Sequence, residues 1–143
     1  MKKLPILILI ASFAMACVKD KPLAPTVTTE KEMAVVKEAE KISSGTFMNG
    51  VHPTSGKVEI VLDKIDTKKK YLSFTGFKTD AGPDLRIYLS EDLKAKSYTE
   101  ISKLTKTGDF LVELPSDAMP DKQKYVLIWC QSFSVLFGSA KLE

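Results

Sequence analysis

Short runs of alternating hydrophobic and polar residues, separated by turn residues, fill the chain from Ser44 onward. The run 57–63 is the clearest, with Val58, Ile60 and Leu62 on one face and charged side chains on the other. Such alternation is typical of β-strands that have one buried face. The other runs that we interpret as strands are 45–49, 71–77, 85–90, 98–102, 110–114, 126–130 and 134–142. The pattern predicts an all-β domain over residues 44–143, an antiparallel β-sandwich or barrel of about seven or eight strands.

The stretch 124–140, KYVLIWCQSFSVLFGSA, predicts two strands joined by a turn at Gln131 and Ser132. Strand alternation places Cys130 on the same face as Val126 and Ile128, and Trp129 on the other face. Both faces are apolar, which indicates a central, covered strand. In the second strand, strict alternation predicts two opposite faces. One face has Leu136, Gly138, Ala140 and Leu142, and the other has Phe137, Ser139 and Lys141.

The N-terminal residues 1–16 have the pattern of an export signal, with a basic start and an apolar run from Leu4 to Phe13. That run is shorter than the roughly 20 residues of a membrane-spanning helix. Ala14, Met15 and Ala16 before Cys17 resemble the lipobox of bacterial lipoproteins, in which the cysteine is lipidated; an ordinary small-residue cleavage site is the alternative. We therefore expect a lipid-anchored protein of the bacterial cell envelope, at the periplasmic face or the cell surface.

Residues 17–43 carry the features of a lipidated N-terminus and a tether. The segment 18–29 contains two prolines and several threonines and lacks hydrophobic periodicity. The segment 30–42 is rich in Glu, Lys and Ala, and it spaces Met33, Val36 and Ala39 as on a short helix. The length of 143 residues leaves room for one folded domain in addition to the signal peptide and the tether.

The charge balance argues against nucleic acid as a partner. The whole chain has a formal net charge of +3, from 21 basic and 18 acidic residues. Removal of Lys2 and Lys3 with the signal peptide leaves a balance of about +1, which is no electrostatic footprint for nucleic acid or for an anionic membrane surface.

Cys130 is the residue that most directly suggests chemistry. If Cys17 carries lipid, Cys130 has no partner within the chain in an oxidising compartment. If Cys17 is free, a disulfide between the two is the alternative. Cys130 itself has two interpretations, a small core hydrophobe or a redox thiol or cofactor ligand, and the second requires exposure or a charged partner.

His52, the only histidine, lies in the predicted loop 50–56, where a solvated loop residue is the simplest interpretation. Proximity to Cys130 would let the imidazole activate the thiol or complete a ligand pair. One His and one Cys are too few for a zinc site, so we expect no metal centre. The cofactor is unknown; haem would require an axial ligand such as Cys130, His52, Met48 or Met119, and a C-x-x-C-H attachment motif is absent.

Two further sets of residues are candidates. Asp80 and Asp84 flank Gly82 and Pro83, where turn capping is the simplest interpretation and a loop site is the alternative. Trp129 is a further redox or cofactor candidate, although a tryptophan in such a strand is more often a core residue than part of an electron relay. We expect no catalytic residues.

Several motifs resemble the DM-thirteen domain family. They are Gly45-Thr46-Phe47, Gly50-x-His52-x-x-Ser55-Gly56, Phe74-x-x-Phe77, Gly82-Pro83-Asp84-Leu85-x-x-Tyr88-Leu89 and Ile128-Trp129-Cys130-x-x-Phe133-Ser134-Val135-x-Phe137-Gly138-x-Ala140. This family is described as an electron-transfer module, found beside DOMON domains in animal proteins and also in bacterial envelope proteins. The resemblance implies that Cys130 is the family's signature cysteine, with a proposed role as a redox thiol or as the ligand of a prosthetic group such as haem.

Two functions therefore compete. The first is a membrane-anchored electron-transfer domain that acts through Cys130 on a redox protein partner. The second is a binding or structural lipoprotein in which Cys130 only packs. In the second case the loops 50–56 and 79–83 would contact a protein or glycan partner. A thiol enzyme built on Cys130 and His52 lacks a third orienting residue.

Overall fold

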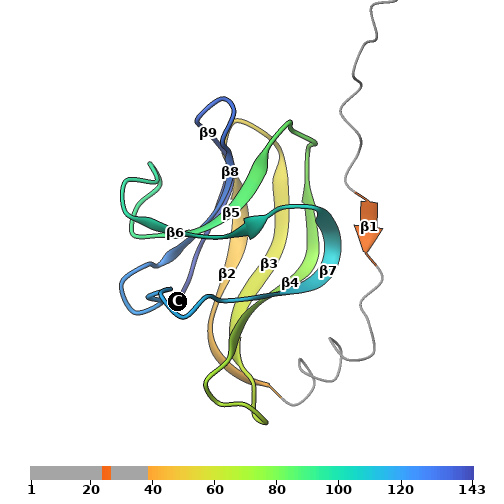
Figure 1. Ribbon diagram of the computed structural model, residues 1–143. Helices are drawn as coiled ribbons and strands as arrows, with labels where there is room; N and C mark the ends of the chain where they lie inside the picture. Colours follow the sequence, from red (N-terminus) through yellow and green to blue (C-terminus); the bar gives the residue numbers. More distant parts are fainter. Residues whose placement is uncertain (1–23, 27–38) are drawn as a thin grey trace, which may run out of the picture.

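The computed structural model describes residues 24–26 and 39–143, and it contains strands and no helix in these ranges (Figure 1). A short first strand, β1, precedes eight strands, each of which overlaps one of the eight predicted runs. The strands are β1 (Ala24–Thr26), β2 (Glu40–Asn49), β3 (Thr54–Leu62), β4 (Lys70–Thr79), β5 (Leu85–Ser90), β6 (Tyr98–Lys103), β7 (Lys106–Glu113), β8 (Tyr125–Cys130) and β9 (Val135–Lys141). The all-β prediction is confirmed.

The strands form one curled sheet in the order β1-β7-β4-β3-β2-β9-β8-β5-β6. The pairings among β2 to β9 are antiparallel, and β1 pairs with β7 in parallel. β6 and β7 follow each other in the chain but belong to opposite ends of this order, so the sheet must curl to bring them into contact. The result is a half-barrel, which is the barrel alternative of the prediction (Figure 1).

The hydrophobic core fills the concave side of this sheet. Its centre is a cluster of four phenylalanine rings, in which Phe74 stacks on Phe110 at 4.4 Å between ring centroids and lies against Phe47 and Phe77. Offset and edge-on ring contacts of this kind stabilise a core beyond the area that they bury. Of the predicted inward residues, Val58, Ile60, Leu85, Ile87 and Leu89 belong to this core. Leu62, which we had predicted on the same face as Val58 and Ile60, is only half-buried at the end of β3 and lies outside it.

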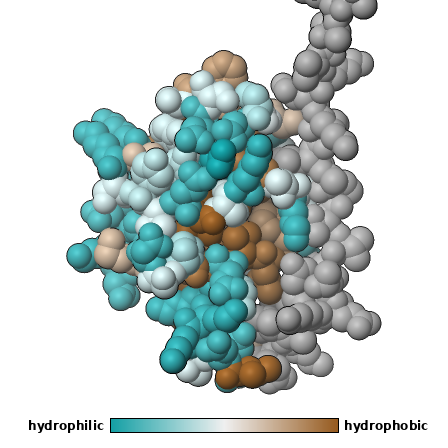
Figure 2. All heavy atoms as spheres, in the orientation of Figure 1, coloured by the Kyte–Doolittle hydropathy of each residue, from teal (hydrophilic) through white to brown (hydrophobic). Residues whose placement is uncertain are grey.

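The half-barrel is open between β6 and β7. A cavity of about 200 Å³ lies there, and core residues such as Ile87 and Phe110 form part of its lining. Figure 2, in the orientation of Figure 1, shows hydrophobic atoms at the centre of this face with hydrophilic side chains around them.

The structure corrects the boundary between tether and domain. β2 begins at Glu40, so residues 40–42, which we assigned to a short helix, are strand. The reason is tertiary: Lys41 is opposite Val61 of β3, and its ammonium group lies 2.7 Å from the Glu59 carboxylate. A strand partner of this kind outweighs a weak helical preference. Residues 30–38 of the predicted helix, the signal peptide and Cys17 lie outside the described residues.

A second correction concerns β9. The register between β8 and β9 shifts between Ile128 and Trp129, which are opposite Gly138 and Leu136. Phe137 is therefore an extra residue, a β-bulge, and strict alternation fails at this point. Because of the bulge, Phe137 joins Ala140 in the core, although we had predicted opposite faces for them.

Candidate functional site

Cys130 lies in the core at the end of β8. Its strand is hydrogen-bonded to β5 and β9, and in this register Cys130 is opposite Leu85 and Val135. Its exposed fraction is 0%, as are those of Val126 and Ile128. The predicted grouping of these three side chains in one buried face is confirmed. Within the described part of the chain, Cys130 is a free thiol.

The surroundings of Cys130 are those of a packing residue. Thiol exchange and metal ligation use the thiolate, which forms readily beside a cation and must be accessible to its reaction partner. Leu85 and Val135 are apolar, and the thiol has no exposed surface. A reagent would therefore reach the Cys130 sulfur only after the strands around it separate.

Trp129 lies on the opposite face of β8, where it is half-buried. It is the last ring of a diagonal row that starts at Tyr98 in β6 and crosses Tyr88 in β5. The ring centroids of Tyr98 and Tyr88 are 4.2 Å apart, and those of Tyr88 and Trp129 are 6.4 Å apart, with both pairs stacked. Tyr98 is opposite Ser90, two residues from Tyr88, so the row follows the diagonal neighbours that antiparallel strands create.

The middle ring of this row, Tyr88, is almost completely buried, with an exposed fraction of 2%. Burial raises the pKa of its phenol to about 12, and the nearby Tyr98 and Glu100 act in the same direction. The Tyr88 hydroxyl therefore keeps its proton at neutral pH.

Asp84 and Arg86 form an ion pair on the same outer face. Arg86 donates two hydrogen bonds to the Asp84 carboxylate, at 2.8 and 3.2 Å, and a third to Glu100 at 2.6 Å. The hydrogen bonds from Arg86 lower the pKa of Asp84, and the two carboxylates raise the pKa of Arg86. Since Arg86 is opposite Trp129 in the strand register, this network fixes a cation beside the row of rings.

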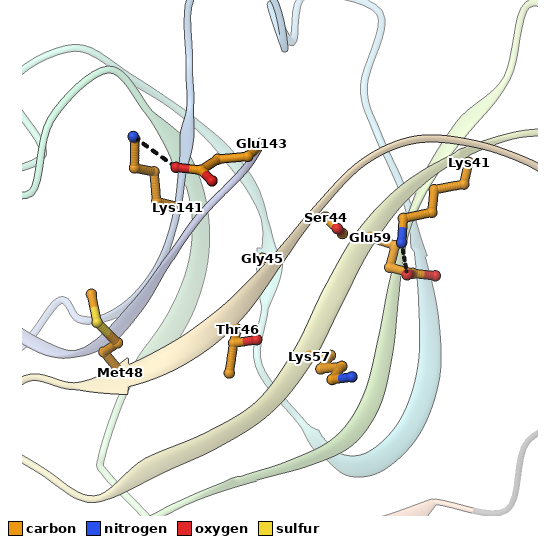
Figure 3. Close-up of a pocket in the computed structure, with 9 residues that line it drawn as sticks. All are labelled: Lys41, Ser44, Gly45, Thr46, Met48, Lys57, Glu59, Lys141 and Glu143. Atoms are coloured by element: carbon orange, nitrogen blue, oxygen red, sulfur yellow. Dashed lines mark hydrogen bonds and ion pairs between the residues drawn. The ribbon is translucent and has the colours of Figure 1, made fainter.

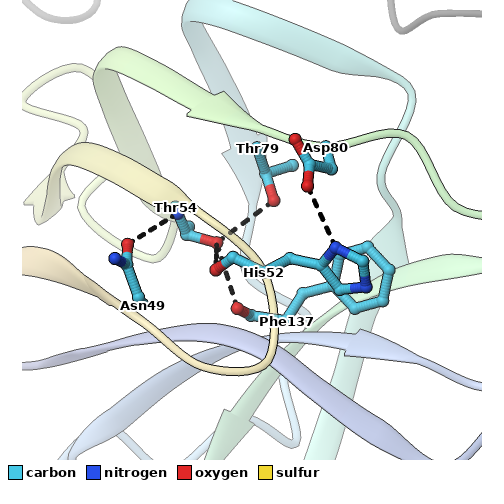
Figure 4. A network of polar contacts seen from close by, with 6 residues as sticks. All are labelled: Asn49, His52, Thr54, Thr79, Asp80 and Phe137. Atoms are coloured by element: carbon cyan, nitrogen blue, oxygen red, sulfur yellow. Dashed lines mark hydrogen bonds and ion pairs between the residues drawn. The ribbon is translucent and has the colours of Figure 1, made fainter.

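His52 and Asp80 meet where the loop after β2 approaches the end of β4 (Figure 4). Asp80 Oδ2 accepts a hydrogen bond from Nδ1 of His52 at 3.0 Å. The imidazole also stacks on the ring of Phe137, with 3.9 Å between the ring centroids. The His52 side chain remains 38% exposed, so this pair lies at the surface of the domain.

The bulge in β9 holds the His52 loop in place. The carbonyl of Phe137 accepts hydrogen bonds from the amides of Gly50 and His52, at 2.8 and 3.3 Å, and from the Thr54 hydroxyl at 3.2 Å. Thr54 packs against Gly138, where a Cβ atom would lie only 2.4 Å from the Thr54 side chain. The Phe137 carbonyl at the bulge therefore binds three groups of this loop, and Figure 4 draws its contact with Thr54.

Residues 46–142, more than half of the chain, match the family described as Electron transfer DM13. The chain belongs to this DM13 family. No curated protein and no solved structure matches the chain. The resemblance inferred from the sequence motifs is thus confirmed at the level of the domain.

In this DM13 domain the predicted site residues lie in three separate places. Cys130 and Trp129 are neighbours in β8 that point to opposite faces. His52 and Asp80 form a surface pair, and the contacts of His52 within the described residues are with Asp80 and Phe137 rather than with Cys130. Asp84 binds Arg86 instead, so the two aspartates do not form one acidic site.

The residues proposed as haem ligands do not fit a haem. Cys130 is sealed in the core, and Met48 and Met119 are exposed on β2 and on the segment before β8. None of these candidates, His52 included, lines the cavity between β6 and β7, and only Met48 lines the larger cavity at β2 and β3. Among the residues that the structure describes, no three His, Cys, Asp or Glu side chains form a metal cluster, and no helix is long and apolar enough to cross a membrane.

The cavity that includes Met48 has a volume of about 500 Å³ and lies where β2 and β3 approach the last residues of the described chain (Figure 3). Two ion pairs, Lys41 with Glu59 and Lys141 with Glu143, border it. Its lining is mostly polar and charged, which suits solvent better than a hydrophobic cofactor.

The sequence interpretation missed Tyr88, Tyr98 and Phe137 as parts of these sites. Tyr88 and Tyr98 occupy outward positions of their strands, but the strand order that stacks them is a long-range property. Phe137 is placed by the bulge, for which the sequence contains one signal, the adjacent Gly138.

Proposed function

We propose that this DM13 domain is held at a membrane of the bacterial cell envelope and takes part in electron transfer without exposing the Cys130 thiol. Family membership supports the electron-transfer role. The complete burial of Cys130 is the observation that carries the second part of the proposal, that the thiol stays unexposed, because disulfide exchange requires contact between a thiolate and the attacked sulfur. Electrons would instead pass to a redox protein partner through the outer face of the sheet.

The membrane attachment is part of the proposal. Lipidation at Cys17 would place the domain near membrane-bound redox proteins, and two or more acyl chains are needed for durable anchoring. Mass spectrometry of the mature chain tests it: a diacylated or triacylated Cys17 is expected, and an unmodified Cys17 would contradict it.

Alkylation tests the sealed thiol. We expect iodoacetamide to leave Cys130 unmodified in the native chain and to modify it rapidly in urea, because reaction requires the sheet to open. Rapid modification of the native protein, at the rate of the unfolded chain, would show an accessible thiol and overturn this mechanism.

Complementation tests the electron-transfer role. In a deletion strain of the source bacterium, we expect the wild type and Cys130→Ala to restore electron flow in membrane vesicles equally. The melting temperature of the variant serves as its folding control. Failure of the wild type itself would overturn the role in electron transfer, and failure of a folded Cys130→Ala would assign the chemistry to the thiol.

The second candidate function is a binding or structural lipoprotein, and the His52–Asp80 pair is the observation that favours it. This pair joins the loops 50–56 and 79–83, which we had predicted as contact loops, into one surface. Asp80→Asn would then reduce capture of a protein or glycan partner, whereas Cys130→Ala would not. Equal capture by both variants would contradict this candidate.

A further inference from the structure

We infer that Tyr98, Tyr88 and Trp129 form a one-electron relay that connects the Cys130 end of β8 with solvent at Tyr98. This inference rests on the proposed electron-transfer function and supplies its route. It would serve a one-electron oxidant, such as an oxidised metalloprotein partner, that contacts the outer face of the sheet.

The geometry of the three rings supports the relay. Their centroids are separated by 4.2 and 6.4 Å, both pairs are stacked, and the rings belong to three adjacent strands of one sheet. The rate of electron tunnelling falls steeply with distance, so rings at these separations exchange electrons faster than rings that lie further apart. The middle ring is shielded from solvent and the outer two are not: Tyr88 is 2% exposed, whereas Trp129 is half-buried and Tyr98 is 44% exposed.

The proton positions set the end point of the relay. Oxidation removes one electron from the Trp129 indole, which then takes one electron from the tyrosines and returns to its neutral state. Tyr98 finally loses the electron, and its hydroxyl proton passes to water, which leaves a neutral tyrosyl radical. Tyr88 is only 2% exposed, so bulk water does not reach its hydroxyl to take the proton, whereas Tyr98 is 44% exposed. The oxidising equivalent therefore passes Tyr88 and comes to rest on Tyr98.

Core packing alone does not explain this row. The core of the domain lies on the other side of the sheet and includes Val126, Ile128 and Cys130. The three rings lie on the outer face, and Tyr98 at its end remains substantially exposed. A row that runs from an exposed ring in β6 to a half-buried ring in β8 suits transfer along the outer face of the sheet.

The test uses a photosensitiser fixed at the far end of the relay. Gln131 is exposed and follows Cys130, whereas Tyr98 is level with Tyr125 at the opposite end of β8. The two ends are about 20 Å apart at the usual rise of a strand. We would couple a ruthenium polypyridyl maleimide to the full chain carrying Cys17→Ser and Gln131→Cys, and oxidise it by a flash with a cobalt(III) ammine as electron acceptor.

Transient absorption and electron paramagnetic resonance then locate the radical. In the parent chain we expect a tyrosyl radical after the flash. In Tyr98→Phe we expect no tyrosyl radical and a longer-lived tryptophan radical. In Trp129→Phe we expect neither radical. Tyr125→Phe is the matched control, because Tyr125 is a half-buried ring on the same face of β8 and belongs to no described ring pair. Its signal is expected to equal that of the parent chain.

Three results would overturn the relay: no tyrosyl radical in the parent chain, an unchanged tyrosyl radical in Trp129→Phe, or its loss in Tyr125→Phe. Circular dichroism of each variant verifies that the sheet is intact. The flash experiment requires no cellular partner. Its failure is therefore separable from a failure of complementation, which would overturn the proposed function and leave the relay as a property of the fold.

Discussion

The two faces of β8 differ sharply although they alternate along six residues. On the inner face, Val126, Ile128 and Cys130 are completely buried. On the outer face Leu127 is buried, but Tyr125 and Trp129 are only half-buried. Cys130, the most conspicuous residue of the sequence motif, is thus less accessible than its neighbour Trp129. Reactivity at this strand depends on which face a residue occupies, and the outer face is the one that a partner can reach.

The largest expected effect comes from the inner face. Ile128→Ala should lower the free energy of unfolding by about 2–5 kcal/mol, because it removes buried methyl groups and leaves a cavity in the core. Urea unfolding monitored by Trp129 fluorescence measures this loss.

Tyr125→Ala is the matched change on the outer face of the same strand, and it should cost clearly less because its ring is only half-buried. Equal losses for the two variants would mean that both faces of β8 are packed to the same degree. The comparison between the faces would then fail.

The second prediction concerns Tyr88 on the outer face. Its pKa is raised from 10.0 to about 12 in the folded state. Stabilisation from a raised pKa is fully present below the unfolded value, pH 10, and is lost as the pH rises through the folded value. The expected loss is about 2–3 kcal/mol, since one pKa unit corresponds to roughly 1.4 kcal/mol.

Urea titrations between pH 9 and pH 12.5 would measure this loss, with Tyr88→Phe as the control. Tyr71 also has a raised pKa and remains in the variant, so only the difference between the two proteins reports on Tyr88. Identical pH profiles would show that the Tyr88 phenol is hydrated in the folded protein.

The third prediction separates packing from chemistry at Cys130. A serine hydroxyl at this position would lie among apolar side chains, and an unpaired buried hydroxyl costs about 1–3 kcal/mol. Cys130→Ser should therefore be less stable than Cys130→Ala by about that amount in urea unfolding. If serine were tolerated as well as alanine, a polar partner or water would have to lie near the sulfur, and the inner face would not be sealed.

Strand periodicity predicts the fold well because each strand buries one face. All eight predicted runs are strands, and the inward residues of 85–90 are those of the core. The failures arise where a distant contact overrides the local pattern. Pairing with β3 makes residues 40–42 strand, and the bulge at Phe137 reverses the alternation in β9.

The candidate site was only partly predictable for the same reason. Local alternation was enough to place Cys130 and Trp129 on opposite faces. The pairing of His52 with Asp80, 28 residues away, depends on how two loops meet, and the stacking of Tyr98, Tyr88 and Trp129 depends on the order of three strands. No single-strand pattern contains that information.

The smallest expected effect is that of the Asp84–Arg86 ion pair on the outer face. Hydrogen bonds from Arg86 lower the pKa of Asp84 below 3.8, so its stabilisation is present above that value and is lost as the pH falls through the folded pKa. Solvent and salt screen a pair at this depth, which keeps the effect small. Asp84→Asn should flatten the acid limb of stability in low salt and change it little in high salt. Glu143→Gln removes the ion pair between Glu143 and Lys141. The Glu143 side chain is 75% exposed, so this variant should have a smaller effect still. An equal response of the two variants would mean that the charges near Trp129 are held no more firmly than those of the exposed pair at the end of β9.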